Sequence, residues 1–302
     1  GLRGQVMTEM VALREAGAVA FSDDGATIMD SAVMRRVFEY SRLADAAVIV
    51  HAEDCHLRGG GVVHEGPVST RLGLPGNPAA AEEIMIARDL RLAALTGAHL
   101  HVAHVSTAGS VQLIRRAREE GLRVTAEVTP HHLFLTDEAT SSFDTSTRVA
   151  PPLRSAADTV ALREALVEGV IDVIATDHAP HATYEKEVEF TLAPPGMIGL
   201  ETALGLTLEL VHEGHLSPLE LIRRWSTRPA RLLGLEGGTL AEGAPADVTL
   251  VDPDRVWTYD PARGFSKSRN SPWIGRSLRG RATATIVGGR LVYHHEKGVL
   301  IR

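Results

Sequence analysis

Four side chains with metal-binding chemistry are spread widely along this sequence: Asp24, His51, His104 and Asp177. Imidazole nitrogens and carboxylate oxygens together suit zinc, and a zinc ion brings the pKa of a bound water molecule close to neutrality. Such a site supplies a hydroxide nucleophile at neutral pH without a serine or a cysteine. The residue types therefore predict metal-assisted hydrolysis, provided that the fold brings the four side chains together.

Each of the four follows one of five short apolar runs. The runs are typical of buried strands, and they occupy residues 18–21, 47–50, 99–103, 123–128 and 170–175. After a helix expected at residues 5–15, helical patterns alternate with the runs at residues 31–44, 77–96, 110–119 and 155–167. This alternation predicts an α/β fold with a parallel sheet, and barrel enzymes hold their catalytic groups at the carboxyl-terminal rim of such a sheet.

A strand-end histidine on its own is more often a hydrogen-bonded structural residue than a ligand, and this applies to His51 and to His104 separately. Two imidazoles and two carboxylates at matching strand ends are harder to explain by packing, because a buried charge without a partner is costly. The set as a whole favours a metal site.

Other histidines and the single cysteine are expected to have structural roles. Of the neighbours His131 and His132, one is expected to support the site while the other caps or packs. His101 shares a strand face with residue 99, which favours a structural or supporting role for both histidines, and His64 is expected at the surface. Cys55 is expected to be an ordinary buried thiol.

The pattern changes after residue 202. Helices are expected at residues 203–213 and 218–225, and short strands at residues 247–251, 281–287 and 290–293. We therefore expect two domains, a barrel domain over residues 1–236 and a small β subdomain over residues 237–302.

Composition limits the classes of partner. The chain has 302 residues, of which 44% are hydrophobic, enough for one large domain and a small one. Its net charge of −7 and the lack of a basic cluster argue against nucleic acid and anionic membranes, so a small-molecule substrate is expected. The sequence has one cysteine and no charged leader or long apolar run, which makes the cytoplasm the default location.

Nine motifs occur in order along the chain: AVAFSDDG, HAED, HVAHVSTAGS, EVTPHHL, APPLR, DVIATDHAPH, PPGMIGLET, STRPARLLGL and GTLAEGAPADVTLVDP. Together they resemble the motifs of the long-chain bacterial dihydroorotases of the amidohydrolase superfamily. The likeness covers residues 1–292. It implies a (β/α)8 TIM-type barrel with a small β-sandwich, and the interconversion of N-carbamoyl-L-aspartate and L-dihydroorotate in pyrimidine synthesis.

The resemblance also implies roles for the metal ligands. Asp24 would bridge two zinc ions, His51 and His104 would bind one of them, and Asp177 would be both a ligand and the catalytic acid and base. The family's His-x-His pair on the first strand has no counterpart here, so a second zinc site is expected to need a preceding segment. We expect the barrel to be incomplete at its N-terminal end, with five strands of eight, and the chain alone to be poorly active.

Substrate contacts follow from the same resemblance. His181 is expected to touch the substrate, and the backbone around Pro195 and Gly196 to hold the ring amide. Ala150 stands where many relatives carry an asparagine, so a contact to the ring is expected to be weaker by about 1–3 kcal/mol if it is not replaced.

Two alternatives remain open at this point. One is a catalytically silent scaffold that supports aspartate transcarbamoylase. The other is a cyclic amidohydrolase for dihydropyrimidines, hydantoins or allantoin, enzymes that often bridge their metals through a carbamylated lysine. Lys186, Lys267 and Lys297 are the only lysines and none follows an expected barrel strand, which favours dihydroorotase. A homodimer and a complex with aspartate transcarbamoylase are further partners that the resemblance leaves open.

Overall fold

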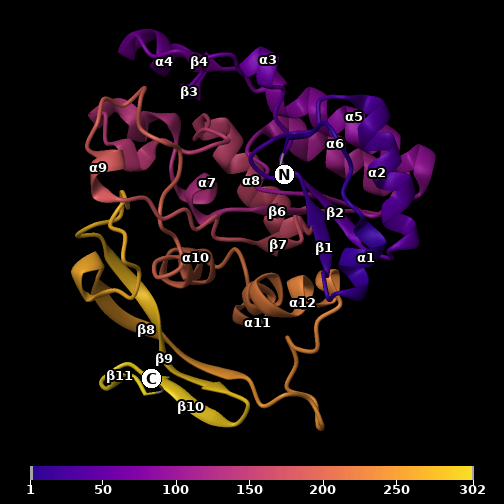
Figure 1. Ribbon diagram of the computed structural model, residues 1–302. Coiled ribbons are helices and arrows are strands. Elements are labelled where there is room, and N and C mark those ends of the chain that lie inside the picture. Colours follow the sequence, from indigo (N-terminus) through magenta and orange to yellow (C-terminus); the bar gives the residue numbers. More distant parts are fainter. Residues whose placement is uncertain (1–2, 301–302) are drawn as a thin grey trace.

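A parallel sheet of five strands forms the centre of the molecule (Figure 1). The computed structural model describes residues 3–300. The strands lie side by side in the order β1, β2, β5, β6, β7, and their bounds are Ala20–Ser22, Ala47–Val50, Leu100–Val102, Val124–Val128 and Val173–Ile174. These are the five predicted runs in the predicted parallel arrangement. β2 has the predicted bounds, and the other four strands are trimmed or shifted by a few residues.

Helices cover one face of this sheet. They are α1 (Met10–Glu15), α2 (Ser31–Leu43), α5 (Ala80–Thr96), α6 (Ala108–Glu119) and α8 (Ala156–Glu168). α2 contacts α5, α5 contacts α6 and α6 contacts α8, so the helices follow the strand order around the outside. Each of α2, α6 and α8 begins after a side chain that accepts backbone N–H bonds, namely Asp30, Thr107 and Ser155.

The alternation of side chains along the strands explains why one face is apolar and the other is not. Val48, Leu100 and Val124 stand in register and are buried in the main core against the helices. The next residues along each strand point to the opposite face, because side chains in a strand alternate. These residues are Ile49, His101 and Thr125 in register, followed by Glu127 two residues later. The inner face of the sheet is therefore partly polar.

An excursion between β2 and α5 was not predicted. It contains α3 (Cys55–Arg58), β3 (Val63–His64), α4 (Pro67–Leu72) and β4 (Gly76–Asn77), and lies at the top of the molecule in Figure 1. β3 and β4 form a short parallel pair. Its elements are too brief to leave a periodic apolar pattern, which is why the sequence did not reveal them. The short helices α7 (Pro130–Phe134) and α9 (Thr183–Lys186) escaped prediction for the same reason.

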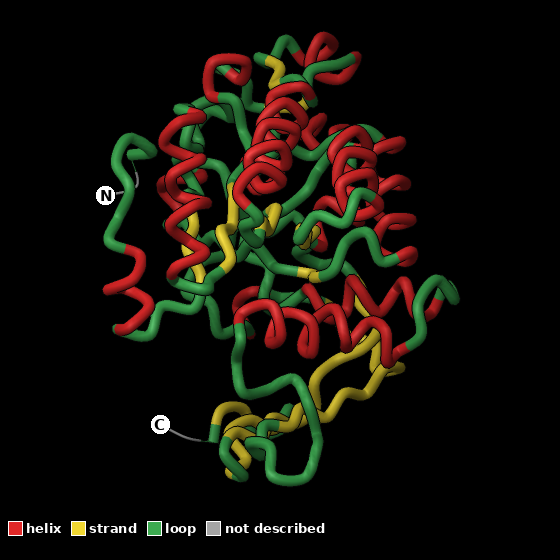
Figure 2. Tube along the Cα trace, turned by 90° about the vertical axis from the view of Figure 1, so that its right-hand side faces the viewer, coloured by secondary structure: helices red, strands yellow, loops and turns green. Residues whose placement is uncertain are grey.

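The C-terminal part begins with α10 (Ala203–His212), α11 (Pro218–Ile222) and α12 (Arg228–Leu233). A π-helical turn, Arg223–Thr227, joins the last two. An antiparallel sheet follows, in the order β11, β10, β9, β8, with bounds Gly298–Val299, Arg290–His294, Ser277–Val287 and Val248–Thr258. α10 packs on β9, and Figure 2 shows the sheet below the layer of helices.

The antiparallel sheet lies within the range expected for the small β subdomain, residues 237–302, and the division of the chain into two domains stays a prediction. The expected boundary at residue 236 falls in the loop between α12 and β8; residues 1–2 and 301–302, at the outer ends of the two expected domains, lie outside the described part. Of the β-sandwich that the resemblance implies, residues 3–300 supply one sheet. The fold class is the expected α/β class, with β1 and β7 as the outer strands of the parallel sheet.

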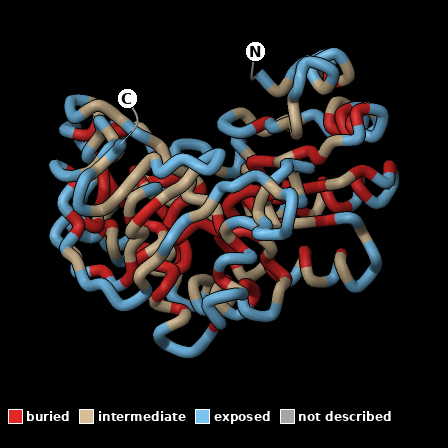
Figure 3. Tube along the Cα trace, turned by 90° about the horizontal axis from the view of Figure 1, so that it is seen from below, coloured by how far each residue is buried: buried red, intermediate tan, exposed pale blue. Residues whose placement is uncertain are grey.

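Buried residues are concentrated between the parallel sheet and its helices (Figure 3). The main core joins apolar strand residues to Phe38 of α2, Ile86 of α5, Ile114 of α6 and Leu162 of α8. This packing fixes the strand positions and hence the rim at their carboxyl ends. None of the helices in residues 3–300 combines the length and apolar character needed to span a bilayer.

Candidate metal centre

Three donor atoms converge at the carboxyl-terminal rim of the parallel sheet. Nδ1 of His51 lies 2.9 Å from Nε2 of His104, and Oδ1 of Asp24 lies 3.2 Å and 3.6 Å from these nitrogens. Both imidazoles are buried, whereas the Asp24 side chain is 63% exposed. The structure thus brings three of the four predicted ligands into one cluster that opens to solvent on one side.

Short segments after the strands position these groups. Asp24 follows β1 by two residues, His51 follows β2 directly, and His104 follows β5 by two residues. The backbone of His104 has a φ of 33°, and that of Asp177, after β7, has a φ of 46°. Such left-handed backbone is uncommon for residues with a side chain and is often found at functional sites.

The adjacent carboxylates Asp23 and Asp24 have opposite environments. Asp23 is buried and accepts the backbone N–H groups of His51 and Ile28, each at 2.9 Å. Burial raises the pKa of Asp23. In contrast, hydrogen bonds from His104 and then His51 hold the pKa of Asp24 well below its usual range. Asp23 therefore fastens the ends of β1 and β2 together, while Asp24 remains an anion facing the imidazoles.

The cluster favours one positive charge. Burial lowers the pKa of His51, but the nearby carboxylates of Asp24 and Glu53 outweigh burial and raise the pKa to about 9. A proton or a metal ion can supply this charge, and the two compete because a ligating imidazole must be neutral. Metal binding is therefore expected to weaken as the pH falls.

Asp177, the fourth predicted ligand, lies outside the three-atom cluster. Burial raises its pKa, the charge of His104 lowers it, and the charges of Asp24 and Glu127 raise it further. A raised pKa suits a group that accepts a proton and later returns it.

The predicted substrate-binding residues form a separate group of loops. The Gly196 N–H donates to the carbonyl of Arg148 at 2.7 Å, and the Gly196 carbonyl accepts from Lys186 Nζ and Asn270 Nδ2, each at 3.1 Å. Both backbone groups of Gly196 are therefore paired within the protein. Ala150 lies two residues beyond Arg148 in the same segment.

His181 belongs to this group through its ring and its backbone. Its Nε2 lies 2.9 Å from the carbonyl oxygen of Pro195, and its N–H donates to Oδ1 of Asn270 at 3.3 Å. The nearby His178 was not singled out in the sequence. Its Nδ1 accepts the N–H groups of residues 199 and 200 at 3.1 Å and 3.3 Å, so it fastens the loop after β7 to the following segment.

The structure separates the roles of His131 and His132. The ring of His132 lies 2.8 Å from the Thr129 hydroxyl and 3.1 Å from the Pro151 carbonyl, so it ties the end of β6 to the segment around Ala150. His131 is buried, and its Nε2 has no hydrogen-bond partner within residues 3–300. Burial and the charge of its neighbours lower its pKa well below the usual value. His132 is the packing residue of the pair.

His99 and His101 share a partner, as their common face predicted. Both rings contact the Thr125 hydroxyl, at 3.1 Å and 2.9 Å, and His101 also lies 3.1 Å from Glu127 Oε2. These contacts fit the expected structural or supporting role.

Two smaller predictions about the excursion were wrong. His64 is half-buried rather than on the surface, with Nδ1 3.3 Å from Nη1 of the buried Arg154. Cys55 is exposed rather than buried, because it opens α3 on the outside of the molecule. Both residues lie in the segment whose fold was not predicted.

Three carboxylates were missed by sequence reasoning, of which Glu82 is buried and Glu53 and Glu127 are half-buried. Glu53 lies behind His51, Glu127 lies on the inner sheet face, and Glu82 of α5 accepts hydrogen bonds from residues 106, 107 and 110. A signal for Glu127 was present, since it stands at an alternate position within an apolar strand. Glu53 and Glu82 had no comparable signal.

Comparisons with known proteins agree with this geometry. The family model described as "Amidohydrolase family" matches residues 2–292. The chain is 58% identical to a dihydroorotase of Pelotomaculum thermopropionicum over 293 residues, which are 97% of this chain and 69% of that protein. It is 54% identical to a dihydroorotase of Anaeromyxobacter dehalogenans over 98% of this chain and 69% of the relative.

This chain belongs to the amidohydrolase family.

Solved structures place the amidohydrolase among barrel enzymes. An L-hydantoinase (dihydropyrimidinase) from Arthrobacter aurescens superposes with a TM-score of 0.86 at 29% identity, covering 97% of this chain and 68% of that one. A D-hydantoinase structure gives a TM-score of 0.84 at 25% identity, covering 96% and 67% of the two chains. Members of this family are typically metal-dependent, which agrees with the three-residue cluster.

The donor atoms of the amidohydrolase fit a metal ion. Around a tetrahedral ion with bonds of about 2.0 Å, ligand atoms lie roughly 3.3 Å apart. The separations of 2.9, 3.2 and 3.6 Å bracket this value. Two imidazoles and one carboxylate are also a ligand set that catalytic zinc sites take from the protein.

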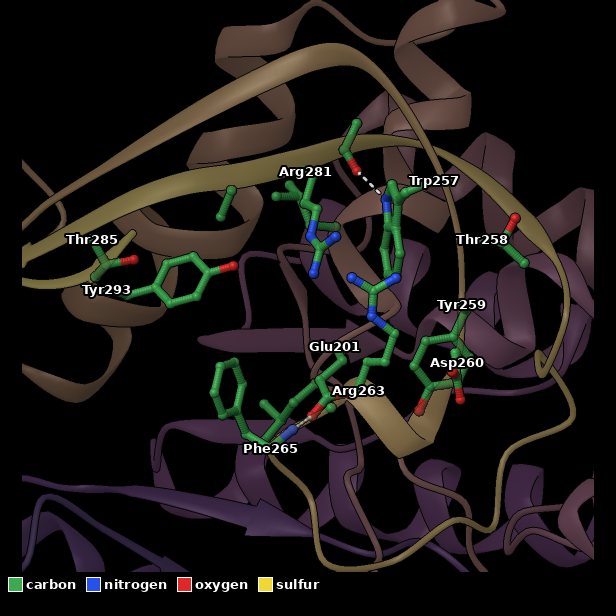
Figure 4. A pocket seen from close by; sticks show the side chains of 16 residues that line it. Glu201, Trp257, Thr258, Tyr259, Asp260, Arg263, Phe265, Arg281, Thr285 and Tyr293 are labelled. Carbon is green, nitrogen blue, oxygen red and sulfur yellow. Dashed lines mark hydrogen bonds between the residues drawn. The ribbon is translucent and has the colours of Figure 1, made fainter. Parts of the chain in front are cut away.

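A cavity of about 310 Å³ lies elsewhere in this amidohydrolase, between α10 and the antiparallel sheet (Figure 4). Two of the charged side chains that line it, Arg281 and Glu201, already have partners within the protein. The guanidinium of Arg281 lies 4.6 Å from the ring centroid of Trp257, and Glu201 accepts the N–H groups of Phe265 and Ser266 at 2.5 Å and 3.0 Å. None of the three cluster residues lines this cavity.

Proposed function

We propose that this chain carries the metal centre of a zinc-dependent dihydroorotase, which interconverts N-carbamoyl-L-aspartate and L-dihydroorotate in pyrimidine synthesis. The observation that carries the proposal is the convergence of Asp24, His51 and His104, in a chain 58% identical to a dihydroorotase over 97% of its length. We propose zinc because it favours imidazole and carboxylate ligands and keeps an open position in catalytic sites.

The proposed reaction gives each residue of the site a task. Zinc bound there would polarise a carbonyl oxygen and lower the pKa of a water molecule. Asp24, His51 and His104 would hold the ion, and Asp24, whose side chain is 63% exposed, would be the ligand shared with a second ion. Asp177, the proposed catalytic residue and further ligand, accepts a proton from the attacking water and returns it to the ring nitrogen as the amide bond breaks. In cyclisation it moves the proton from the carbamoyl nitrogen to the departing hydroxide.

Substrate contacts are proposed for His181, Pro195, Gly196 and Ala150. Because both backbone groups of Gly196 are paired inside the protein, a ring amide there would exchange with one of those bonds. The His181 ring would likewise exchange its contact to the Pro195 carbonyl for one to the substrate. Ala150 offers only its backbone, so the ring contact is weaker than one made by an amide side chain.

A hydantoinase or dihydropyrimidinase activity is the second candidate, because the solved structures that superpose on this chain carry those names. A carbamylated lysine bridge is not available to this chain. Lys186, from α9, donates Nζ to the carbonyls of Pro194 and Gly196, and neither Lys267 nor Lys297 follows a strand of the parallel sheet. The identity to dihydroorotases is also higher, 58% against 29%.

A comparison of substrates tests the proposal. We expect the zinc-loaded chain to turn over L-dihydroorotate faster than hydantoin, dihydrouracil or allantoin, and we expect Asp177→Asn to lower this rate by about 10²–10⁴-fold. The same assay measures whether the chain alone is poorly active. Faster turnover of hydantoin or dihydrouracil would show that the dihydroorotase assignment is wrong. Absence of both turnover and zinc binding would favour the silent scaffold instead.

Association and location are further parts of the proposal. We propose a cytoplasmic enzyme that forms a homodimer or a complex with aspartate transcarbamoylase, on the strength of the resemblance. Light scattering of the chain alone, and of a mixture with the transcarbamoylase, distinguishes these states by mass.

A further inference from the structure

We propose that Glu53 is a positioning residue for the metal centre, a carboxylate that holds the His51 ring by its far nitrogen and fixes the tautomer that can bind metal. The inference rests on the proposed metal site at Asp24, His51 and His104. The glutamate of the HAED motif would then orient the histidine of the same motif. The excursion of residues 55–77 would hold that glutamate in place.

The two nitrogens of His51 face different partners. Nδ1 points into the cluster, 3.2 Å from Asp24 and 2.9 Å from His104. Nε2 points the other way and lies 3.7 Å from Oε2 of Glu53. This distance is that of an ion pair rather than a closed hydrogen bond. The negative charge of a carboxylate on this side favours the tautomer that carries its proton on Nε2, which leaves the Nδ1 lone pair free for a metal and makes it more basic.

Glu53 is itself held in place. Its side chain is 12% exposed, and its Oε1 accepts from Asn77 Nδ2 at 2.9 Å. Oε2 lies 3.4 Å from Nε of Arg58. The backbone N–H of Glu53 donates to the Thr27 hydroxyl at 3.3 Å, and that hydroxyl donates to the His51 carbonyl at 2.6 Å. A carboxylate held from several sides orients its partner ring more firmly than a mobile one.

The excursion supplies two of these anchors. Arg58 ends α3, and Asn77 lies in β4, where its backbone carbonyl accepts from Nη1 of the buried Arg154 at 2.8 Å. Arg154 also donates to the hydroxyl of Ser106, just after the ligand His104. A continuous set of contacts therefore joins the segments that follow β2 and β5 through the excursion. Breaking this set of contacts is expected to make the His51 ring more mobile without destabilising the barrel.

Metal affinity provides the first test, because it does not depend on turnover. Zinc binding to the 302-residue chain is measured by competition with a chromophoric chelator. We expect Glu53→Gln to weaken zinc binding by about 10–100-fold, and Asn77→Ala to weaken it less. Glu65→Gln is the matched control, since it removes an exposed carboxylate from the same excursion and should bind like the parent. His51→Ala should lose binding most.

The tautomer provides the second test. In the zinc-loaded chain labelled with ¹⁵N-histidine, NMR should show His51 protonated at Nε2, with slow exchange of that proton. Glu53→Gln should speed the exchange at least tenfold without unfolding the chain, as checked by thermal melting. If Glu53→Gln does not fold, Asn77→Ala carries both measurements.

The outcomes separate this inference from the proposed function. Unchanged zinc affinity and exchange in Glu53→Gln, with loss of zinc in His51→Ala, would overturn the role of Glu53 and leave the metal site standing. Weaker affinity with an unchanged exchange rate would also overturn it, by showing a purely structural effect. Full zinc binding by His51→Ala would remove the proposed metal site, and this inference with it.

Discussion

Two regions of this molecule gather polar and aromatic side chains, the rim of the parallel sheet and the cavity beside the antiparallel sheet. The cavity has the volume, about 310 Å³, but two of its charged groups already have partners: Arg281 lies over the Trp257 ring, and Glu201 accepts two backbone N–H groups. At the rim, two buried imidazoles and a carboxylate crowd together. The imidazoles hold the pKa of Asp24 well below its usual range, and the carboxylates of Asp24 and Glu53 raise the pKa of His51 despite its burial. The difference teaches that a reaction centre is better recognised by ionisable side chains with shifted pKa values than by the volume of a cavity.

The largest expected effect concerns the rim itself. The double variant Asp24→Ala, His104→Ala should hold no zinc at concentrations that saturate the parent. Each ligand of a four-ligand zinc site contributes on the order of 3 kcal/mol, so losing two lowers affinity by at least about 10⁴-fold. Metal analysis after dialysis measures this. Equal zinc in parent and double variant would place the metal elsewhere, and exposed His215→Ala serves as the control.

A second prediction concerns the polar groups behind the rim. Glu82 is 3% exposed and accepts the N–H of Ser106 at 3.0 Å and the hydroxyl of Ser110 at 2.7 Å. Glu82→Ala leaves these donors unpaired beside Arg154 and should lower the free energy of unfolding by about 3 kcal/mol. Urea unfolding measures the change, with the exposed Glu164→Ala as control. A loss no larger than that of the control would contradict the prediction.

Acid stability sharpens the comparison further. Burial lowers the pKa of His132 to about 3, whereas an unfolded histidine has a pKa of about 6.5. The unfolded chain therefore takes up a proton below pH 6.5 that the folded chain refuses, and stability falls by about 1.4 kcal/mol per pH unit as the pH drops from 6 to 4. His132→Asn should flatten this slope by that amount. Urea unfolding across this range measures it; an unchanged slope would mean that His132 titrates normally.

The smallest predicted effect belongs to the cavity. Arg281→Ala removes the cation–π contact with Trp257 and should lower stability by about 0.5–1 kcal/mol. Zinc affinity and turnover should stay within twofold of the parent. A tenfold loss of turnover in a folded variant would break the contrast between the two regions, since it would give the cavity a part in the reaction.

Much of the fold could be predicted because its long elements leave periodic patterns. The five strands and the helices α2, α5, α6 and α8 appear within a few residues of their expected positions. Three ligands could be predicted because strands that run parallel deliver their ends to one rim, wherever they lie in the chain.

The remaining features depend on contacts between residues that are distant in the sequence, and such contacts leave no periodic pattern. The excursion of residues 55–77 has elements of two to six residues, too short for a pattern. The inward position of Glu53 depends on Asn77, which lies 24 residues away. Asp23 and Asp24 are adjacent and have the same side chain. Only the fold shows that Asp23 accepts backbone N–H groups, whereas Asp24 faces the imidazoles.

The left-handed backbone at His104 and Asp177 has an evolutionary consequence. Glycine would adopt either conformation without strain, so glycine would favour the stability of the folded chain at both positions. A laboratory selection for heat resistance alone would be drawn toward that exchange and would discard an imidazole and a carboxylate. Thermal stability and turnover therefore conflict at these two residues. A selection for more stable variants has to measure both.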